Sequence, residues 1–304
     1  MPIRSEKPNS IQSSEGGPSS SDHSQNSQIA DRFLQEYSSD NAVRKYSRST
    51  AGAGIEYLLE NDYGAIYKSV FNRYVPEAVK KTGLNLLEFG CGAGMNLIYL
   101  VTLLDKMGIR VGHAVGADFS ETLIATANLE AESYLPPDLR PKVKFCVARN
   151  ESLIDDMHRQ LGIGKEELRG SFHLAIGVNT IRYSHRLGNV GECVEDIYSL
   201  LFGGCACIVI DMNKGFPFFR SRVRDRLNKS AEERYLPTLD EYASPFVDAG
   251  FEVVRKTYFS WVPHSASPRL LKAIRTLTPV LNKVVPTRAM RCLIVSRKPT
   301  SFVL

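Results

Sequence analysis

The sequence predicts an α/β fold, with a doubly wound, mostly parallel sheet of seven strands and helices on both faces. From residue 84 onward, short β-type runs alternate with longer helical ones, which is typical of sheets built from strand–helix–strand units. A glycine-rich stretch, LLEFGCGAGMNL at residues 86–97, follows the first β-type run and precedes a helical one. Turns of this kind bind ligands at the carboxyl ends of the strands in such sheets.

The expected elements follow from the length and periodicity of these runs. Five strands are expected at 84–89, 111–117, 142–147, 171–178 and 203–211, and two further β-type runs lie at 251–258 and 290–297. Helices are expected between the first five strands, near 94–107, 120–133, 150–161 and 189–202.

The chain divides into a tail, a helical segment and one large domain. Residues 1–28 are rich in Ser, Gly, Gln and Asn, which predicts a disordered tail and not a secretory signal. Residues 29–82 are expected to form a helical, aromatic cap. Residues 83–304 are expected to form the ligand-binding domain, with inserts near 212–240 and 259–289. These inserts are natural places for substrate contacts.

Composition excludes several classes of function. The net charge of +5 is diffuse, and no basic tract interleaves with aromatic residues, which disfavours nucleic-acid binding. No apolar stretch approaches the ~20 residues that span a bilayer. The spacings of the six cysteines resemble neither a disulfide framework nor a zinc site. We therefore expect free thiols, no metal and a cytoplasmic location.

The glycine-rich stretch departs from the dinucleotide-binding fingerprint, which has a small residue at the third position of G-x-G-x-x-G/A. Gly90 and Gly92 fit, but bulky Met95 occupies the third position and Gly94 comes one residue early. Glu88 would repel a pyrophosphate and would favour a cation. The expected ligand carries positive charge and no phosphate, as S-adenosylmethionine does.

The run EFGCGAG at residues 88–94 resembles motif I of the class I, seven-stranded S-adenosylmethionine-dependent methyltransferases. The resemblance extends over roughly residues 80–298 and includes the two glycines that open the fifth β-type run. It implies that the motif wraps the methionine end of the cofactor and that its acid orients the amino group. The cofactor contacts implied here are Glu88, Gly90, Cys91, Gly92 and Gly94.

Further cofactor contacts are expected after the next three strands. Asp118 can accept hydrogen bonds from both ribose hydroxyls, a role that methyltransferases and dehydrogenases share, and Phe119 follows it. Arg149 stands where the resembled family often has an acid near the adenine. Asn150 could serve instead, or could cap the following helix. Asn179, after the fourth strand, is the last expected cofactor contact.

The polar stretch after the fourth strand is where the resembled family places the methyl acceptor. It lacks the prolines of the N-P-P-Y motif, which disfavours adenine-N6 and glutamine substrates. A base assists methyl transfer to a hydroxyl or a protonated amine, and histidine is the usual base near neutral pH. His185 is the first candidate, with His264 and Tyr183 as further ones. Each could equally be a structural or surface side chain.

The resulting prediction is a methyltransferase of small-molecule biosynthesis, which moves a methyl group from S-adenosylmethionine to an O, N or C atom of a partly apolar metabolite. The alternatives are an NAD-dependent oxidoreductase and a non-catalytic S-adenosylmethionine-binding partner or regulatory protein. The sequence does not fix the oligomeric state.

Two features of the inserts bear on the acceptor. The basic, amphipathic stretch 269–285 could form an acceptor lid, touch an anionic lipid surface, or simply pack on its own domain. Aromatic residues in the inserts could line an apolar acceptor pocket. They are Phe216, Phe218, Phe219 and Trp261.

Overall fold

The computed structural model describes residues 31, 32, 35, 37, 39, 43, 47, 52–219 and 235–300. The tail predicted at 1–28 lies outside the described residues, as does most of the insert predicted near 212–240. The predicted division of the chain into tail, cap and domain stays a prediction.

Seven strands form one sheet in the order β3-β2-β1-β4-β5-β7-β6. Strand β7 runs antiparallel to β5 and β6, and the other neighbours are parallel. The predicted fold class is confirmed, and each strand begins and ends within two residues of its predicted bounds. The strands are β1 Leu84–Phe89, β2 Val111–Asp118, β3 Val143–Val147, β4 Phe172–Val178, β5 Leu201–Met212, β6 Glu252–Phe259 and β7 Arg291–Arg297.

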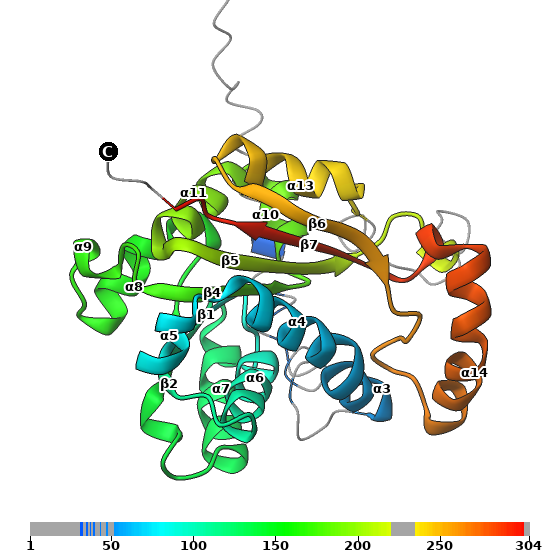
Figure 1. Cartoon of the computed structure of the whole chain (residues 1–304), viewed down its shortest axis with the longest axis horizontal. Coiled ribbons are helices and arrows are strands. Elements are labelled where there is room, and N and C mark those ends of the chain that lie inside the picture. Colours follow the sequence, from blue (N-terminus) through cyan, green and yellow to red (C-terminus); the bar gives the residue numbers. More distant parts are fainter. Residues whose placement is uncertain are drawn as a thin grey trace, which may run out of the picture.

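Helices cover both faces of the sheet (Figure 1). One face carries α4 (Gly64–Tyr74), α6 (Met95–Lys106) and α7 (Glu121–Tyr134), and the other carries α8 (Leu153–Leu161), α11 (Val190–Leu200) and α13 (Leu239–Asp248). The other α-helices are α3 Ala53–Tyr57, α5 Glu77–Thr82, α9 Lys165–Leu168, α10 Ile181–Leu187 and α14 Pro268–Val284. A π-helical turn, η2, spans Leu58–Tyr63, and short 3-10 turns lie at Arg140–Lys142, Asn150–Ser152, Pro217–Phe219 and Pro286–Arg288.

The central strand β1 divides the core in two, because successive side chains of a strand point to opposite faces. Leu84 and Leu86 join the cluster with α4 and α6, while Leu87 and Phe89 join the cluster with α11 and α13. Glu88 has the same parity as Leu86. Its side chain therefore points toward the α6 face of the sheet.

Two local features fix where α6 and α7 begin. Gly94, at the start of α6, has a φ of 75°, and a Cβ there would lie 2.6 Å from Cζ of Phe145. Glycine is thus required by both conformation and space. Ser120 caps α7, because its Oγ accepts a hydrogen bond from the Leu123 N–H at 3.3 Å.

The segment before the sheet packs partly on the sheet and partly beside its carboxyl edge. Tyr67 of α4 is fully buried, and its hydroxyl donates to Oδ1 of Asn96 at 3.4 Å. Tyr63, four residues earlier, is 2% exposed.

Within the described part of the chain, none of the helices combines the length and the apolar character needed to cross a membrane.

Candidate active site

A cavity opens at the carboxyl ends of β1, β2, β3 and β4. Strand β1 lies between β2 and β4, so the chain winds outward in both directions from this point of the sheet. Ligands bind at such a switch point in open α/β sheets. The cavity is also lined by α10 and by the segment before the sheet.

The glycine loop after β1 forms one wall of this cavity. Gly90 and Gly92 have φ angles of 62° and 54°, in the left-handed region that glycine adopts without cost. A Cβ on Gly90 would overlap Oγ1 of Thr180. Cys91, between them, is buried and donates its N–H to the carbonyl of Ala117 at 2.9 Å. The loop therefore offers bare backbone to a ligand.

Asp118 lies beside the loop at the end of β2 and lines the cavity. Its carboxylate oxygens accept the backbone N–H of Gly92 at 2.8 Å and that of Ser120 at 3.0 Å. Burial raises the pKa of Asp118 to about 6, and these two hydrogen bonds oppose the rise. Each carboxylate oxygen has a further acceptor position. Asp118 can thus accept a pair of hydroxyl groups from a ligand.

Glu88 is held by α6 and does not line the cavity. Its carboxylate accepts the Leu97 N–H at 2.9 Å and the Asn96 side-chain amide at 3.2 Å. Burial raises the pKa of Glu88 to about 8, against the effect of these hydrogen bonds. Since the carboxylate has partners within the protein, it does not by itself require a cationic ligand. Asn96 does line the cavity, so a ligand would meet Asn96 first.

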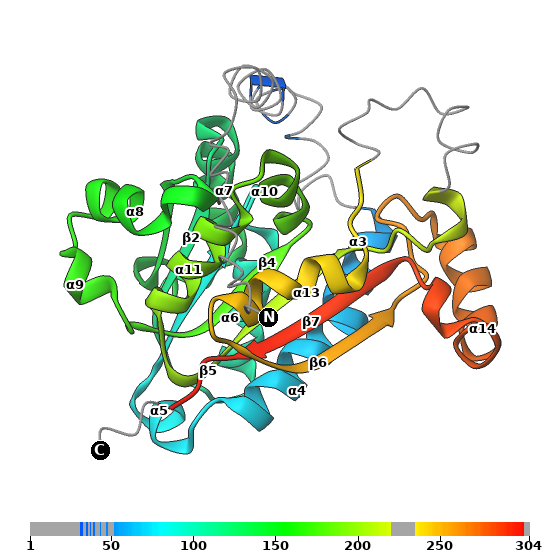
Figure 2. The ribbon, with the colours of Figure 1, turned by 90° about the horizontal axis from the view of Figure 1, so that it is seen from above.

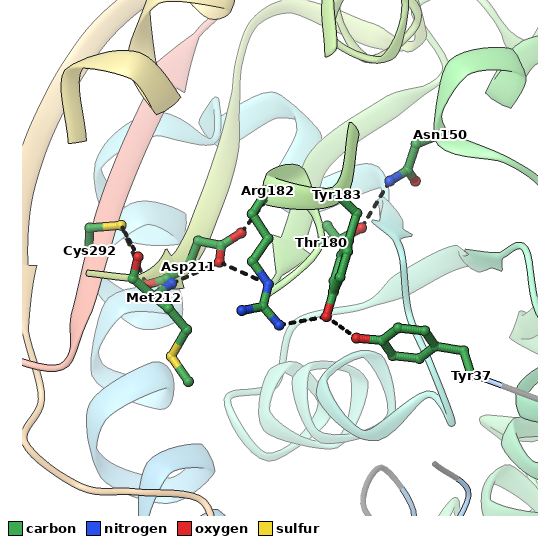
Figure 3. A network of polar contacts seen from close by, with 8 residues as sticks. All are labelled: Tyr37, Asn150, Thr180, Arg182, Tyr183, Asp211, Met212 and Cys292. Atoms are coloured by element: carbon green, nitrogen blue, oxygen red, sulfur yellow. Dashed lines mark hydrogen bonds and ion pairs between the residues drawn. The ribbon is translucent and has the colours of Figure 1, made fainter. Parts of the chain in front are cut away.

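Asn150 joins the ends of β3 and β4. Its side-chain amide nitrogen donates to Oγ1 of Thr180 at 2.9 Å and to Oγ of Ser184 at 3.2 Å; Figure 3 shows the first of these bonds. Ser152, not Asn150, occupies the capping position of α8. The helix-cap alternative is therefore wrong, and the amide oxygen of Asn150 is available to a ligand in the cavity.

Asn179, which also lines the cavity, has an unusual environment. Its φ of 56° lies in the left-handed region, which asparagine visits more readily than most residues. Its N–H donates to the carbonyl of Ile210 at 2.7 Å. Its Oδ1 is buried and has no hydrogen-bond partner among the described residues. A ligand that donates a hydrogen bond here would account for this buried acceptor.

Helix α10 turns one face to the cavity. The lining residues have the spacing i, i+3, i+4 and i+7 of a single helical face: Thr180, Tyr183, Ser184 and Leu187. This spacing was the available signal for a helix that was not predicted from the sequence. His185 lies off this face and does not line the cavity. Its Nδ1 is 2.5 Å from the hydroxyl of Tyr235.

The phenol oxygen of Tyr183 is held by a polar network (Figure 3). It accepts a hydrogen bond from Arg182 Nη2 at 2.5 Å, and it is also hydrogen-bonded to the hydroxyl of Tyr37. Behind them, Nε of Arg182 is 3.9 Å from the fully buried carboxylate of Asp211. Burial alone would lower the pKa of Arg182, but Tyr183 and Asp211 raise it overall. Tyr183 is thus fixed at the cavity wall beside a permanent cation.

The cavity also has an apolar wall, supplied by α3 and η2. Its members are Ile55, Leu58, Leu59 and Tyr63. His264, in the loop before α14, lines the cavity as well. Gly54 allows α3 to approach this loop, because a Cβ at Gly54 would overlap the Pro263 carbonyl oxygen.

The four insert aromatics are not brought to the cavity. Phe216 and Trp261 instead pack on each other, with ring centroids 6.3 Å apart, in a small separate cluster with Met290. Phe219 packs against the same cluster, and Phe218 is 65% exposed.

Nine of the twelve predicted site residues line the cavity, and Glu88, Gly94 and His185 do not. The roles of all twelve in binding and catalysis stay predictions. Residues 29–82 were expected to form a cap, but the apolar wall, Tyr37 and Asn96 were not among the predicted site residues. The positions of the apolar wall and of Asn96 depend on how α3, η2 and α6 pack against the sheet.

No protein-family model matches the sequence, and a comparison with curated proteins finds no match. Many solved structures do match. Geranyl diphosphate C-methyltransferase from Streptomyces coelicolor A3(2), in complex with Mg²⁺, geranyl diphosphate and S-adenosyl-L-homocysteine, has a TM-score of 0.54 at 12% identity. The match covers 89% of this chain and 98% of that one.

Two further matches have other activities or origins. An S-adenosylmethionine-dependent methyltransferase from Mesorhizobium loti has a TM-score of 0.50 at 16% identity, covering 79% of this chain and 100% of that one. The [4+2]-cyclase SpnF has a TM-score of 0.51 at 16% identity, covering 78% and 82%.

At this level of identity the matches show the fold and not the reaction, and the cyclase illustrates that one fold hosts different chemistries. The sheet order, with β7 inserted antiparallel between β5 and β6, agrees with them. The chain therefore has the seven-stranded fold of the class I S-adenosylmethionine-dependent methyltransferases.

Proposed function

We propose that this protein transfers a methyl group from S-adenosylmethionine to an O, N or C atom of a small, partly apolar acceptor. The observation that carries the proposal is that one cavity combines two kinds of wall. Asp118 and the glycine loop provide polar groups and exposed backbone for the cofactor. The apolar wall of α3 and η2, together with Tyr183 and His264, provides surfaces for an acceptor.

The polar groups of the cavity fit the cofactor in kind. The Asp118 carboxylate suits the two ribose hydroxyls, because hydrogen bonds to an ionised acceptor are stronger than hydrogen bonds between neutral groups. The free amide oxygen of Asn150 suits the amino group of the adenine. The unpartnered Oδ1 of Asn179 suits a donor such as the ammonium group of the methionine end. The geranyl diphosphate C-methyltransferase with a similar fold was crystallised with S-adenosylhomocysteine.

S-adenosylmethionine supplies an electrophilic methyl group on a sulfonium. In the transfer, the bond from sulfur to the methyl carbon breaks, the bond to the acceptor forms, and S-adenosylhomocysteine is released. Holding the acceptor in line with the reacting carbon supplies much of the rate. We assign this positioning to the apolar wall and to Tyr183, whose phenol oxygen is fixed by Arg182.

A hydroxyl or protonated amine acceptor must also lose a proton. We propose His264 as the base that accepts it, since His264 lines the cavity. His185 is turned toward Tyr235 and lies off the cavity, so it is the weaker choice.

Two alternatives differ in what they require of the cavity. An NAD-dependent oxidoreductase would need a small residue where Met95 stands, and Met95 lines the cavity. A non-catalytic binding protein would hold the cofactor without turnover.

The six cysteines are all free and buried, which supports a location in a reducing compartment such as the cytoplasm.

The experiment is to incubate the purified protein with S-adenosylmethionine labelled on the methyl carbon and with fractionated small-molecule extracts. We expect a labelled product in the organic phase, formed together with S-adenosylhomocysteine, and no product with the Gly90→Ala variant. Cofactor binding without any labelled product across the fractions would favour the non-catalytic alternative.

A further inference from the structure

Helix α14 stands at one end of the molecule, at the opposite end from α8 and α9 (Figures 1 and 2). None of its seventeen residues is buried. Its inner side is partly buried, because Leu271 and Ile274 pack against the core cluster that includes α3, and Leu281 packs beside Trp261. Arg275 contacts α3 as well, and the rest of the circumference of α14 is exposed among the described residues.

An apolar stripe runs along this outer side. Its residues are spaced alternately three and four apart, as on one helical face, and are Leu270, Ala273, Leu277, Val280 and Val284. The exposed fractions of Leu277, Val280 and Val284 are 55%, 60% and 69%. Five of the ten large, exposed hydrophobic side chains among the described residues lie between 270 and 285. Such a concentration marks an interaction surface.

The charge around this stripe is of one sign. From residue 253 to the end of the chain there is no Asp or Glu, whereas there are ten Lys and Arg residues. The whole chain has a net charge of only +5, so the part before residue 253 is net acidic. Five of these basic residues lie on α14 or the turn after it, and all five are exposed: Arg269, Lys272, Arg275, Lys283 and Arg288.

We propose that α14 docks this protein on an anionic lipid bilayer surface. Leu270, Leu277, Val280 and Val284 would enter the boundary between headgroups and acyl chains, and the lysines and arginines would contact the headgroups. A helix with an apolar face, a basic polar face and low overall hydrophobicity lies in the membrane interface in this way. Anionic headgroups attract basic residues that lie near the bilayer surface.

Charge and apolarity together favour lipid over other partners. A second copy of the chain would bring two basic helices together, and like charges repel. A nucleic acid would match the charge but would leave the exposed leucines and valines uncovered. An anionic bilayer satisfies both features of the helix.

The position of α14 gives this docking a consequence for the cavity, which rests on the proposed function. The guanidinium of Arg275 lies over the ring of Tyr57 in α3, 5.3 Å from its centroid. His264 precedes α14 by four residues and lines the cavity. Docking through α14 would therefore bring the apolar wall of the cavity close to the bilayer, where lipid-soluble acceptors reside.

The docking itself can be tested without cofactor or acceptor, so its failure is distinguishable from failure of the proposed function. The full-length protein is sedimented with vesicles of phosphatidylcholine alone and of phosphatidylcholine mixed equally with phosphatidylglycerol. We expect binding to the mixed vesicles and little to the neutral ones. Added salt should weaken the binding, because it screens the charges over a Debye length of about 10 Å at 0.1 M.

Matched variants separate the contribution of the basic residues from that of the apolar stripe. The double variant Lys272→Glu, Lys283→Glu should bind mixed vesicles at least ~25-fold more weakly, at about fivefold for each basic residue lost. Leu277→Glu should weaken binding while leaving the basic residues in place. The controls are Leu129→Glu, a similarly exposed leucine of α7, and Lys81→Glu, an exposed lysine of α5. Both controls should bind as the unchanged protein does.

Three results would overturn the proposal. They are absence of binding to the mixed vesicles, equal binding to neutral and mixed vesicles, and equal losses in the α14 variants and the controls. A dimer in solution that Leu277→Glu abolishes, without lipid binding by the unchanged protein, would identify α14 as a self-association surface. All these side chains are exposed, so thermal melting should show that each variant folds.

Discussion

The carboxylate of Asp118 accepts the backbone N–H of Gly92 at 2.8 Å, so the acid at the end of β2 holds the glycine loop that follows β1. Two motifs that lie 26 residues apart in the chain are thereby joined at one wall of the cavity. A ligand that contacts the acid will also contact the loop. The first predictions follow from this pair.

Replacing Asp118 by Asn keeps the shape of the side chain but removes its charge. Hydrogen bonds to charged groups contribute ~1.5–3 kcal/mol, so the affinity for S-adenosylhomocysteine should fall about tenfold or more. Titration calorimetry measures this directly. Asp105→Asn, at an exposed position near the end of α6, is the matched control and should not change the affinity. Unchanged affinity in folded Asp118→Asn would remove Asp118 from the site.

The raised pKa of Asp118 predicts a pH dependence. Ribose hydroxyls bind the ionised carboxylate, and burial raises the pKa of Asp118 to about 6. Affinity for S-adenosylhomocysteine should therefore be constant well above that pH and fall about tenfold per pH unit below it. Stability should respond in the opposite sense, because an acid with a raised pKa in the folded state favours folding when protonated. Its contribution is fully present below the ordinary pKa of 3.8 and is lost as pH rises through about 6.

The Asp118→Asn variant is also the control for this pH experiment, since it removes the titrating group. Calorimetry between about pH 5 and pH 8 should show a flat profile for the variant near pH 6. Glu88, whose pKa burial raises to about 8, remains in both proteins. An identical fall in affinity for the variant and for the unchanged protein would assign the pH dependence to another group.

Substitution of Gly90 tests whether the glycine loop requires a position without a side chain. Gly90→Ala and Gly108→Ala both place a side chain at positive φ, at 62° and 71°, which costs roughly 1–2 kcal/mol. Only the new Cβ of Gly90→Ala would meet a neighbour, Oγ1 of Thr180, whereas Gly108 faces open space. Gly90→Ala should therefore unfold more readily in denaturant, by a further ~1–3 kcal/mol, and should lose cofactor affinity. Equal behaviour of the two variants would contradict this role of Gly90.

The two histidines are distinguished by their positions relative to the cavity. His264→Gln should lower kcat by ~10²–10⁴-fold if His264 is the base, with little change in cofactor affinity. His185→Gln should leave kcat largely unchanged, because His185 does not line the cavity. Kinetics with the acceptor found by labelling give both values. A larger loss of kcat in His185→Gln would reverse the assignment.

The sequence predicted the sheet and much of the cofactor wall because these depend on local patterns. The glycines follow directly on the apolar run of β1, and Asp118 ends the apolar run of β2, so each feature can be recognised within a few residues. Parallel strands bring their carboxyl ends to one edge, so the positions of Gly92 and Asp118 followed once the strands were assigned. The N-cap of α7 at Ser120 is equally local.

Features that depend on packing between distant segments were not predictable in the same way. Glu88 was interpreted as an acid in need of a cation, but its partner Asn96 is supplied by the first turn of α6. Helix α10 was not predicted, although the spacing of Thr180, Tyr183, Ser184 and Leu187 indicates it, so His185 was not placed relative to the cavity. Trp261 joined a separate cluster because its neighbours come from both inserts, Phe216 from the first and Leu281 from the second.

The central claim is that the cavity binds S-adenosylmethionine and not a dinucleotide. Titration calorimetry with S-adenosylhomocysteine and with NAD, under the same conditions, tests it most directly. We predict that S-adenosylhomocysteine binds at one site per chain and that NAD binds much more weakly, because Met95 stands where a dinucleotide needs a small residue. Tight binding of NAD without binding of S-adenosylhomocysteine would contradict this claim.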